Sequence, residues 1–210
     1  MILHGYWRSG AAYRVRIALN LKGLTYEQRG VDLRTGAQRD ADYLALNPQG
    51  MVPALEVDGA VLTQSPAILE WLEETHPEPA LLPRDPVARA QVRAMSALIA
   101  CDIHPLNNLR VGQAIRREFG ADQTAVDAWA ARWIAPGFEA LETLAARHGR
   151  GWSFGAEPTL ADCYLLPQLY SASRFHVPLK AYPNLLAIQA RALEHPAFID
   201  AYPDRQPDAD

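Results

Sequence analysis

A proline-rich segment divides the sequence into two parts with different patterns. Between His76 and Pro86 lie Pro77, Pro79, Pro83 and Pro86. Because proline lacks a backbone N–H and clashes with the preceding helical turn, no helix continues through this segment. Proline-rich segments also act as semi-rigid spacers between domains. We therefore expect one domain over residues 1–82 and a second over residues 87–210.

The chain before this segment begins with a strand, a helix and a second strand. Residues 2–6 and 26–31 predict the strands, and apolar groups at helical spacing over residues 12–21 predict the helix, which ends at Gly23. The polar stretch 32–42 has no clear periodicity, so we expect it to be mobile.

A hairpin and a helix are expected next. Asp58-Gly59 is a turn dipeptide between the β-type segments 54–57 and 60–62, which predicts a hairpin. Ser65, followed by a proline, predicts the N-cap of a helix over residues 65–75.

After the proline-rich segment every strong pattern is helical. The expected helices cover residues 87–117, 122–148, 159–173 and 183–194. Thr159 and Asp162 have the spacing of a capping box, which we interpret as structural. The sequence therefore predicts a fold that combines α/β and all-α parts, with an α/β domain followed by a helical bundle.

Composition and charge exclude several classes of protein. The chain has 210 residues, of which 49% are hydrophobic and 21% charged, as in ordinary globular proteins. Its net charge of −4 argues against a nucleic-acid partner. No apolar run reaches the roughly 18 residues that a membrane helix needs, and the N-terminus lacks a signal-peptide pattern. We therefore expect a cytoplasmic protein with no membrane partner.

The cysteines and histidines do not indicate a metal site. Cys101 and Cys163 lie far apart in apolar surroundings, without a histidine at ligand spacing. We expect two buried structural thiols and no metal. The tryptophans fall on apolar faces and are expected to pack rather than bind.

The segment Tyr6–Asn20 carries a resemblance to a known family. It reads Tyr-Trp-Arg-Ser-Gly-Ala-Ala-Tyr-Arg-Val-Arg-Ile-Ala-Leu-Asn, which resembles the opening signature of zeta-class glutathione transferases, including maleylacetoacetate isomerases. Further motifs follow in the family's order, namely Asn47-Pro48, Val52-Pro53, Gln64-Ser65, Asp102–Asn108 and Thr159–Asp162. The resemblance implies an N-terminal thioredoxin-like domain that binds glutathione, a C-terminal helical bundle and a homodimer.

Ser9 is the candidate partner of a thiolate. It lies just before the first expected helix, where its hydroxyl and the helix-end amides can stabilise a sulfur anion. A serine in this position is otherwise an ordinary N-cap, and the resemblance is what assigns it the catalytic role. Many family members have Ser-Ser-Cys or Ser-Ser-Ala where this chain has Ser9-Gly10-Ala11, so a neighbouring hydroxyl is absent.

The remaining glutathione contacts are expected in the same domain. The resemblance implies that Pro53 is a cis proline and that the backbone of Val52 pairs with the cysteinyl unit. Gln64 and Ser65 begin a helix, whose free amides suit the γ-glutamyl carboxylate, although a plain N-cap is the alternative. Gln49 would contact the peptide.

The resemblance implies a cis-unsaturated diacid as the second ligand. A dianion needs fixed cations, and we expect Arg8, Arg110 and Arg174 to supply them, although each is otherwise a solvated surface charge. His104 and Asn108 are four residues apart and hence on one helix face. They either form an internal pair or line a cleft near glutathione, and we favour the cleft.

The activity implied is the glutathione-dependent cis–trans isomerisation of maleylacetoacetate to fumarylacetoacetate, with Ser9 and Arg8 as catalytic residues. The related isomerisation of maleylpyruvate is the nearest alternative. A transferase acting on α-halo acids and a glutathione-binding module without catalysis also remain open.

Overall fold

The computed structural model describes residues 1–209, which fall into two compact units. Met1–Leu81 form the first unit together with the chain from Leu193 onward, and Leu82–Ala192 form the second. The first break coincides with the proline-rich segment. The residues from Leu193 onward are placed differently from the prediction. The sequence assigns them to the helical domain, whereas in the structure they belong to the first unit.

A four-stranded sheet is the centre of the first unit. The strands are β1 (Ile2–Gly5), β2 (Glu27–Gly30), β3 (Ala54–Val57) and β4 (Ala60–Thr63). Their order is β2-β1-β3-β4, with β1 parallel to β2 and β3 antiparallel to both of its neighbours. Parallel neighbours need a crossover connection, which is supplied by helix α1 (Gly10–Leu21).

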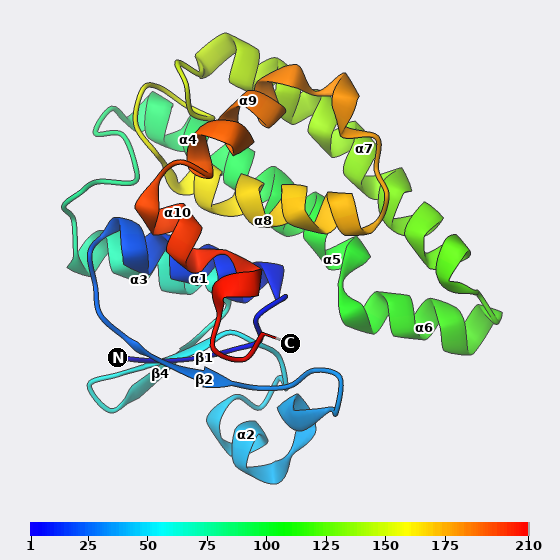
Figure 1. Cartoon of the computed structure of the whole chain (residues 1–210). Helices are drawn as coiled ribbons and strands as arrows, with labels where there is room; N and C mark the ends of the chain where they lie inside the picture. Colours follow the sequence, from blue (N-terminus) through cyan, green and yellow to red (C-terminus); the bar gives the residue numbers. More distant parts are fainter. Residues whose placement is uncertain (210) are drawn as a thin grey trace. The chain divides into compact units, whose positions relative to one another are not determined.

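Helices cover both faces of this sheet. Helix α1, helix α3 (Ser65–Thr75) and helix α10 (Pro196–Ala201) lie on one side, and helix α2 (Ala41–Leu46) lies on the other (Figure 1). Val15, Ile17 and Leu19 of α1 are fully buried and form the core with residues such as Leu55. Each such side chain contributes about 1.5–3 kcal/mol through burial. This thioredoxin-like arrangement confirms the predicted fold of the N-terminal part.

The hairpin is confirmed at the predicted place. Val57 pairs with Ala60, and the turn residues Asp58 and Gly59 have φ values of 48° and 81°. Two central residues with positive φ form the turn that matches the twist of a two-residue hairpin, and the Asp-Gly dipeptide favours that turn.

The stretch expected to be mobile instead has a defined conformation. The carboxylate of Asp32 accepts hydrogen bonds from the backbone N–H of Arg34 at 2.8 Å and from its guanidinium group. A 3₁₀ helix over Ala37–Arg39 follows and leads directly into α2. Local side-chain to backbone bonds therefore order a segment that has no hydrophobic periodicity.

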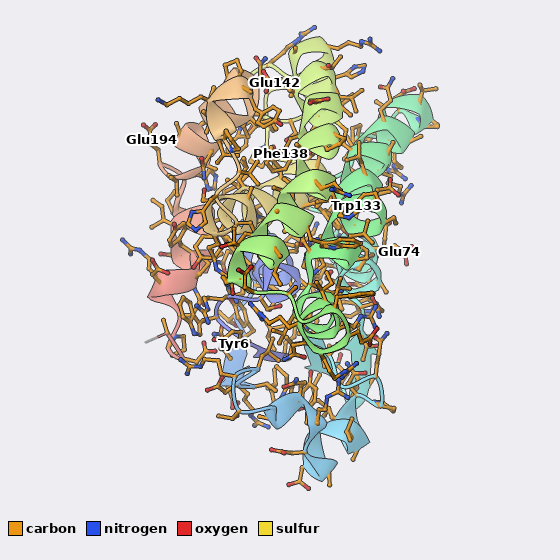
Figure 2. The ribbon with its side chains drawn as sticks, turned by 90° about the vertical axis from the view of Figure 1, so that its right-hand side faces the viewer. Tyr6, Glu74, Trp133, Phe138, Glu142 and Glu194 are labelled. Atoms are coloured by element: carbon orange, nitrogen blue, oxygen red, sulfur yellow. The ribbon has the colours of Figure 1, made fainter. Side chains whose placement is uncertain are left out.

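The second unit is a helical bundle. Its helices are α4 (Pro86–Ala97), a π-helix (Leu98–Ile103), α5 (His104–Asn107), α6 (Leu109–Phe119), α7 (Gln123–His148), α8 (Leu160–Arg174), a 3₁₀ helix (Leu179–Ala181) and α9 (Pro183–Ala192). The ring of Phe138 in α7 packs edge-on against the ring of Tyr182, with 5.5 Å between the two ring centroids. One turn along α7, Glu142 accepts hydrogen bonds from the backbone N–H groups of Asn184 and Leu185 at the start of α9 (Figure 2).

The prediction of one continuous helix over residues 87–117 is wrong. The chain passes through the π-helix, in which the N–H of His104 bonds to the carbonyl of Ile99, five residues earlier. Pro105 follows at once and cannot donate a bond to the preceding turn. Asn108 then has an extended backbone, with ψ at 166°, and caps α6 through its side chain. Proline and asparagine therefore divide a segment that is periodic in its apolar residues.

The predicted capping box at the start of α8 is confirmed. Asp162 is fully buried and accepts hydrogen bonds from Ser153 N at 2.8 Å, Thr159 N at 2.8 Å and Thr159 Oγ1 at 3.0 Å. Burial raises the pKa of Asp162, while its bonds with Ser153 and Thr159 act in the opposite direction. The carboxylate fixes both the loop before α8 and its first turn.

The two cysteines differ from each other in exposure. Cys163 is buried as expected, but Cys101 is exposed, so the prediction of a buried thiol is wrong there. The π-helix changes which side chains face inward, and Cys101 lies within it. Within residues 1–209, no helix is both long and apolar enough to cross a membrane.

Candidate functional site

Ser9 caps the N-terminus of α1. Its backbone is extended and its Oγ accepts a hydrogen bond from Ala12 N at 3.2 Å, as an N-cap does. A hydroxyl that accepts one bond still has its own hydrogen to donate. The amides of Gly10 and Ala11 belong to the first turn, where backbone N–H groups have no intrahelical partner. Together with the positive end of the helix dipole, these donors suit an anion such as a thiolate.

Arg8 lies beside Ser9 and is held by aromatic side chains. Its guanidinium group lies over the ring of Trp7, 4.8 Å from the centroid, and its Nη2 donates to the hydroxyl of Tyr6 at 3.2 Å. Tyr6 is labelled in Figure 2. Arg8 Nε is buried and has no hydrogen-bond partner among residues 1–209. The cation is therefore fixed in position by its two aromatic neighbours.

The start of α3 differs from the sequence prediction. Gln64, not Ser65, is the N-cap residue, and its φ of 67° is unusual for a residue other than glycine. In the described chain no side chain caps this helix. Ser65 is buried, and its Oγ accepts a hydrogen bond from Arg14 Nη1 at 3.3 Å. Pro66 has no N–H, so the first-turn amides of Ser65 and Ala67, with the nearby Arg14 cation, can bind a carboxylate.

The other residues predicted for this site come together next to α3. Gln64 Nε2 donates to Gln49 Oε1 at 2.5 Å, which joins two residues that lie 15 positions apart. The peptide bond between Val52 and Pro53 is cis, as the resemblance implied, and leads into β3. Gln49, Val52, Pro53, Gln64 and Ser65 thus belong to one unit and to adjoining segments.

Tyr43, which the sequence analysis did not single out, and Asn47, which it named only within the Asn47-Pro48 motif, hold the loop that carries Gln49. Tyr43 Oη and Asn47 Nδ2 both donate to the carbonyl of Met51 at 2.7 Å. Asn47 Oδ1 accepts from Gln49 N at 3.1 Å. Burial raises the pKa of Tyr43 to about 12, so its hydroxyl remains a donor at neutral pH.

The prediction that His104 and Asn108 lie on one helix face is wrong. They do not share a helix face, since α5 ends at Asn107 and Asn108 is extended. Asn108 Oδ1 accepts from Val111 N at 3.2 Å, and its Nδ2 donates to Pro105 O at 3.0 Å. Both polar ends of Asn108 therefore serve the local backbone.

Arg110 and Arg174, the other predicted substrate residues, lie in the second unit. Arg110 is exposed in the first turn of α6, directly after the Asn108 cap, and Arg174 is the exposed last residue of α8. Arg8 and Ser9 lie in the first unit. The roles of Arg110 and Arg174 in binding a diacid stay predictions.

The sequence analysis also missed the buried arginines of α1, although the sequence contains a signal for them. Arg14 and Arg16 are 3% and 0% exposed. Their helix is apolar on almost every face, which is typical of a helix buried all round. A charged residue in such a helix must be paired inside the protein.

Comparison with known proteins supports the family relationship. The family description "Glutathione S-transferase, N-terminal domain" matches residues 8–75, and "Glutathione S-transferase, C-terminal domain" matches residues 127–188. A maleylpyruvate isomerase from Ralstonia sp is 51% identical over 212 residues, covering 100% of both chains. A maleylacetoacetate isomerase from Pseudomonas aeruginosa is also 51% identical, over 211 residues that cover 99% of this chain and 98% of the relative.

Two solved structures resemble this one over the full length of both chains. The holo structure of a maleylpyruvate isomerase, described as a bacterial zeta-class glutathione transferase, has 50% sequence identity and a TM-score of 0.98. A maleylacetoacetate isomerase from Methylobacterium extorquens, with bound malonate and glutathione, has 39% identity and a TM-score of 0.95. Because sequence and fold agree over the whole length, this chain belongs to the zeta-class glutathione transferase family.

Proposed function

We propose that this protein is a glutathione-dependent cis–trans isomerase of maleyl keto acids. The observation that best supports this proposal is the start of α1. There the Ser9 hydroxyl has a hydrogen to donate, next to first-turn amides that have no intrahelical partner. These groups stabilise a thiolate at neutral pH, which is the form of sulfur that reacts.

The remaining part of glutathione fits the donors of the first unit. The uncapped N-terminus of α3, with the Arg14 guanidinium beside Ser65, takes the γ-glutamyl carboxylate. The backbone of Val52 pairs with the cysteinyl unit, and Gln49 contacts the peptide. His104 is proposed as a contact for the glycyl end.

Glutathione, when bound, supplies a thiolate that adds reversibly to the cis double bond, so that the bond can rotate before the sulfur leaves. Ser9 holds the sulfur in its anionic form, and its hydroxyl hydrogen remains on the serine throughout. Arg8, which precedes Ser9 in the same loop, stabilises through its guanidinium charge the negative charge that develops on the substrate's carbonyl oxygen.

Arg110 and Arg174 are proposed to bind the carboxylates of the acid. A guanidinium group pairs well with a carboxylate because it presents parallel N–H donors. Asn108 contributes indirectly, since it caps the helix turn that carries Arg110. Replacing Arg174 by alanine is therefore expected mainly to raise KM for the acid, whereas Arg8→Ala is expected to raise KM and also to lower kcat, because Arg8 stabilises charge that develops during the reaction.

Maleylacetoacetate is our proposed substrate, and maleylpyruvate is the alternative that has equal support among the relatives. The two named relatives share the same 51% identity with this chain. Both acids present a cis enoate and a second acidic or keto group to the same arginines. A further structural relative binds malonate and glutathione together, which supports a dicarboxylate as the second ligand.

Turnover assays test the proposal directly. Purified protein is incubated with glutathione and either acid, and both the trans product and free thiol are measured. We expect isomerisation without net loss of thiol, and the ratio of kcat/KM values identifies the substrate. Consumption of thiol with α-halo acids and no isomerisation would contradict the proposal and favour a transferase. Retention on glutathione resin without any turnover would indicate a binding module. A homodimer in the cytoplasm is part of the proposal, and light scattering tests the dimer.

A further inference from the structure

The C-terminal segment of the chain returns to the loop that carries Ser9. Helix α10 packs along α1 in the first unit (Figure 1). After α10, Gln206 Nε2 donates to the carbonyls of Asp200 and Tyr202 at 2.8 and 2.7 Å, which folds the segment back. Gly30 of β2 allows it to pass closely, because a Cβ at this position would lie 3.0 Å from the Cβ of Asp208.

Asp208 binds the loop with both carboxylate oxygens. Its Oδ2 accepts a hydrogen bond from Trp7 N at 2.9 Å, and its Oδ1 accepts from Gln28 Nε2 of β2 at 2.9 Å. The first bond joins the C-terminal segment to Trp7, the residue just before Arg8, and the second joins it to β2.

Arg16 holds the same residue from the other side. Its Nη2 donates to the carbonyl of Trp7 at 2.9 Å, and its Nε donates to the carbonyl of Ala201 in α10 at 3.0 Å. Arg16 is fully buried, and it lies on α1, the helix that Ser9 caps. Hydrogen bonds with a charged partner are about twice as strong as neutral ones, so both peptide groups that flank Trp7 are firmly oriented.

We propose that Asp208 is a positioning residue for the reacting sulfur, because it fixes with Arg16 the backbone that presents Arg8 and Ser9. The turn is short: Ser9 N donates to Tyr6 O at 2.9 Å, so a rotation of the Trp7 peptide moves Ser9 and the first amides of α1. A displacement of about 1 Å at a reacting centre costs on the order of a hundredfold in rate. This inference rests on the proposed function and extends it to a residue about 200 positions away in sequence.

The test compares Asp208→Ala, Asp208→Asn and the control Asp200→Ala. Asparagine keeps an oxygen that can accept from Trp7 N, and Gln28 can turn its amide to meet the new NH₂ group. Asp200 is exposed in the same segment and undergoes the same change of charge. Each variant is saturated with glutathione and titrated with pH while the absorbance of the bound thiolate is followed. The values of kcat and KM are measured with the acid that the wild type converts.

We expect Asp208→Ala to raise the pKa of the bound thiol and to lower kcat by about tenfold or more, with KM for glutathione changed much less. The direction of the pKa shift is decisive, since loss of a nearby negative charge by itself would lower the thiol pKa. Asp208→Asn is expected to restore most of the wild-type behaviour, and Asp200→Ala to retain it.

A purely structural role would give a different result. If Asp208→Ala lowers the melting temperature but leaves kcat and the thiol titration within twofold of wild type, the inference is wrong. Equal losses in Asp208→Ala and Asp208→Asn would also overturn it, because the hydrogen bond to Trp7 would then not be the cause. The thiol titration needs only glutathione, so it tests the inference even if the wild type isomerises neither acid. Failure of the wild type to bind glutathione would overturn both proposals.

Discussion

Ser9 has two roles that substitutions can separate. As an N-cap it stabilises α1, and as a hydroxyl donor it is proposed to stabilise the thiolate. Ser9→Ala removes both and is expected to cost about 1 kcal/mol of stability, whereas Ser9→Gly costs only a few tenths because glycine tolerates the cap position. Both variants should lower kcat by about a hundredfold, the typical cost of one lost donor to a reacting anion.

Ser9→Thr provides the matched control for these variants. Threonine keeps the hydroxyl and caps helices almost as well as serine. Turnover with glutathione, together with thermal unfolding, gives both readouts. If Ser9→Ala and Ser9→Gly turn over at near-normal rates, the amides of the first turn stabilise the thiolate alone.

Tyr43 makes the stability of the fold depend on alkaline pH. Its pKa is raised to about 12 by burial, while an unfolded tyrosine ionises near 10. Below pH 10 both states are protonated, and the contribution to stability is fully present. Between pH 10 and 12 only the unfolded chain releases the proton, so this contribution is progressively lost.

Tyr43→Phe isolates this effect from the other tyrosines. At neutral pH the variant is expected to lose about 1 kcal/mol, because the hydrogen bond to Met51 O is absent. The wild type's advantage in unfolding free energy over the variant should then fall as the pH rises from 10 to 12 and change sign, because a pKa shift of this size outweighs one hydrogen bond. Urea unfolding at several pH values measures it. A difference that stays constant over this range would show that Tyr43 ionises equally in both states.

Lys22 fixes the proline-rich segment to helices α1 and α3 of the first unit. Its side chain is fully buried, and Nζ donates to Glu73 Oε2 at 2.8 Å, His76 O at 2.6 Å and Pro79 O at 3.0 Å. Glu73 also accepts from Leu81 N. Every donor of the ammonium group is therefore used to join the ends of α1 and α3 to the connector.

Lys22→Met is therefore expected to destabilise the protein by about 3 kcal/mol, since it leaves the Glu73 carboxylate, whose side chain is only 12% exposed, without its cation. Lys180→Met removes the same charge from an exposed position and should change stability by less than about 0.5 kcal/mol. Chemical unfolding monitored by tryptophan fluorescence compares the two. Equal effects would mean that the bonds of Lys22 add nothing beyond surface charge.

Sequence patterns predicted those elements whose turns and caps depend on neighbouring residues alone. Asp58-Gly59 fixed the hairpin, and Thr159 with Asp162 marked the start of α8. The sequence did not predict the break at Asn108, because the apolar residues on both sides of it have helical spacing. An asparagine within such a run does not by itself mark the start of a new helix. The N-cap of α3 was placed one residue late, since the positive φ of Gln64 depends on its surroundings rather than on its identity.

The return of the C-terminal segment to the first unit could not be predicted from local patterns at all. It depends on bonds between residues far apart in sequence, such as Arg16 with Ala201 and Asp208 with Trp7. A carboxylate near the end of a chain and an arginine in a helix have no sequence signature that joins them. The family resemblance, by contrast, supplied Ser9 and Gln49, which have little meaning by position alone.

The dependence of KM on salt tests the proposed substrate site, because salt acts differently on the net charge and on fixed arginines. The net charge of −4 repels a dianionic acid, and added salt would weaken that repulsion and lower KM if it dominated. Fixed arginines act in the opposite direction, because salt screens their attraction. Raising the ionic strength from about 0.01 to 0.1 M shortens the Debye length from about 30 to about 10 Å. We expect KM for the acid to rise several-fold over this range.

Arg110→Ala and Arg174→Ala should raise KM at low salt and flatten its dependence on salt. Arg191→Ala is the matched control, since Arg191 is an exposed arginine of the second unit that lies over the ring of Trp152, with no assigned role in binding. Arg191→Ala changes the net charge by the same amount and should leave the dependence of KM on salt as in the wild type. A KM that falls with added salt, or a slope that all three variants alter alike, would mean that the acid responds to the overall charge of the molecule and that Arg110 and Arg174 do not bind it.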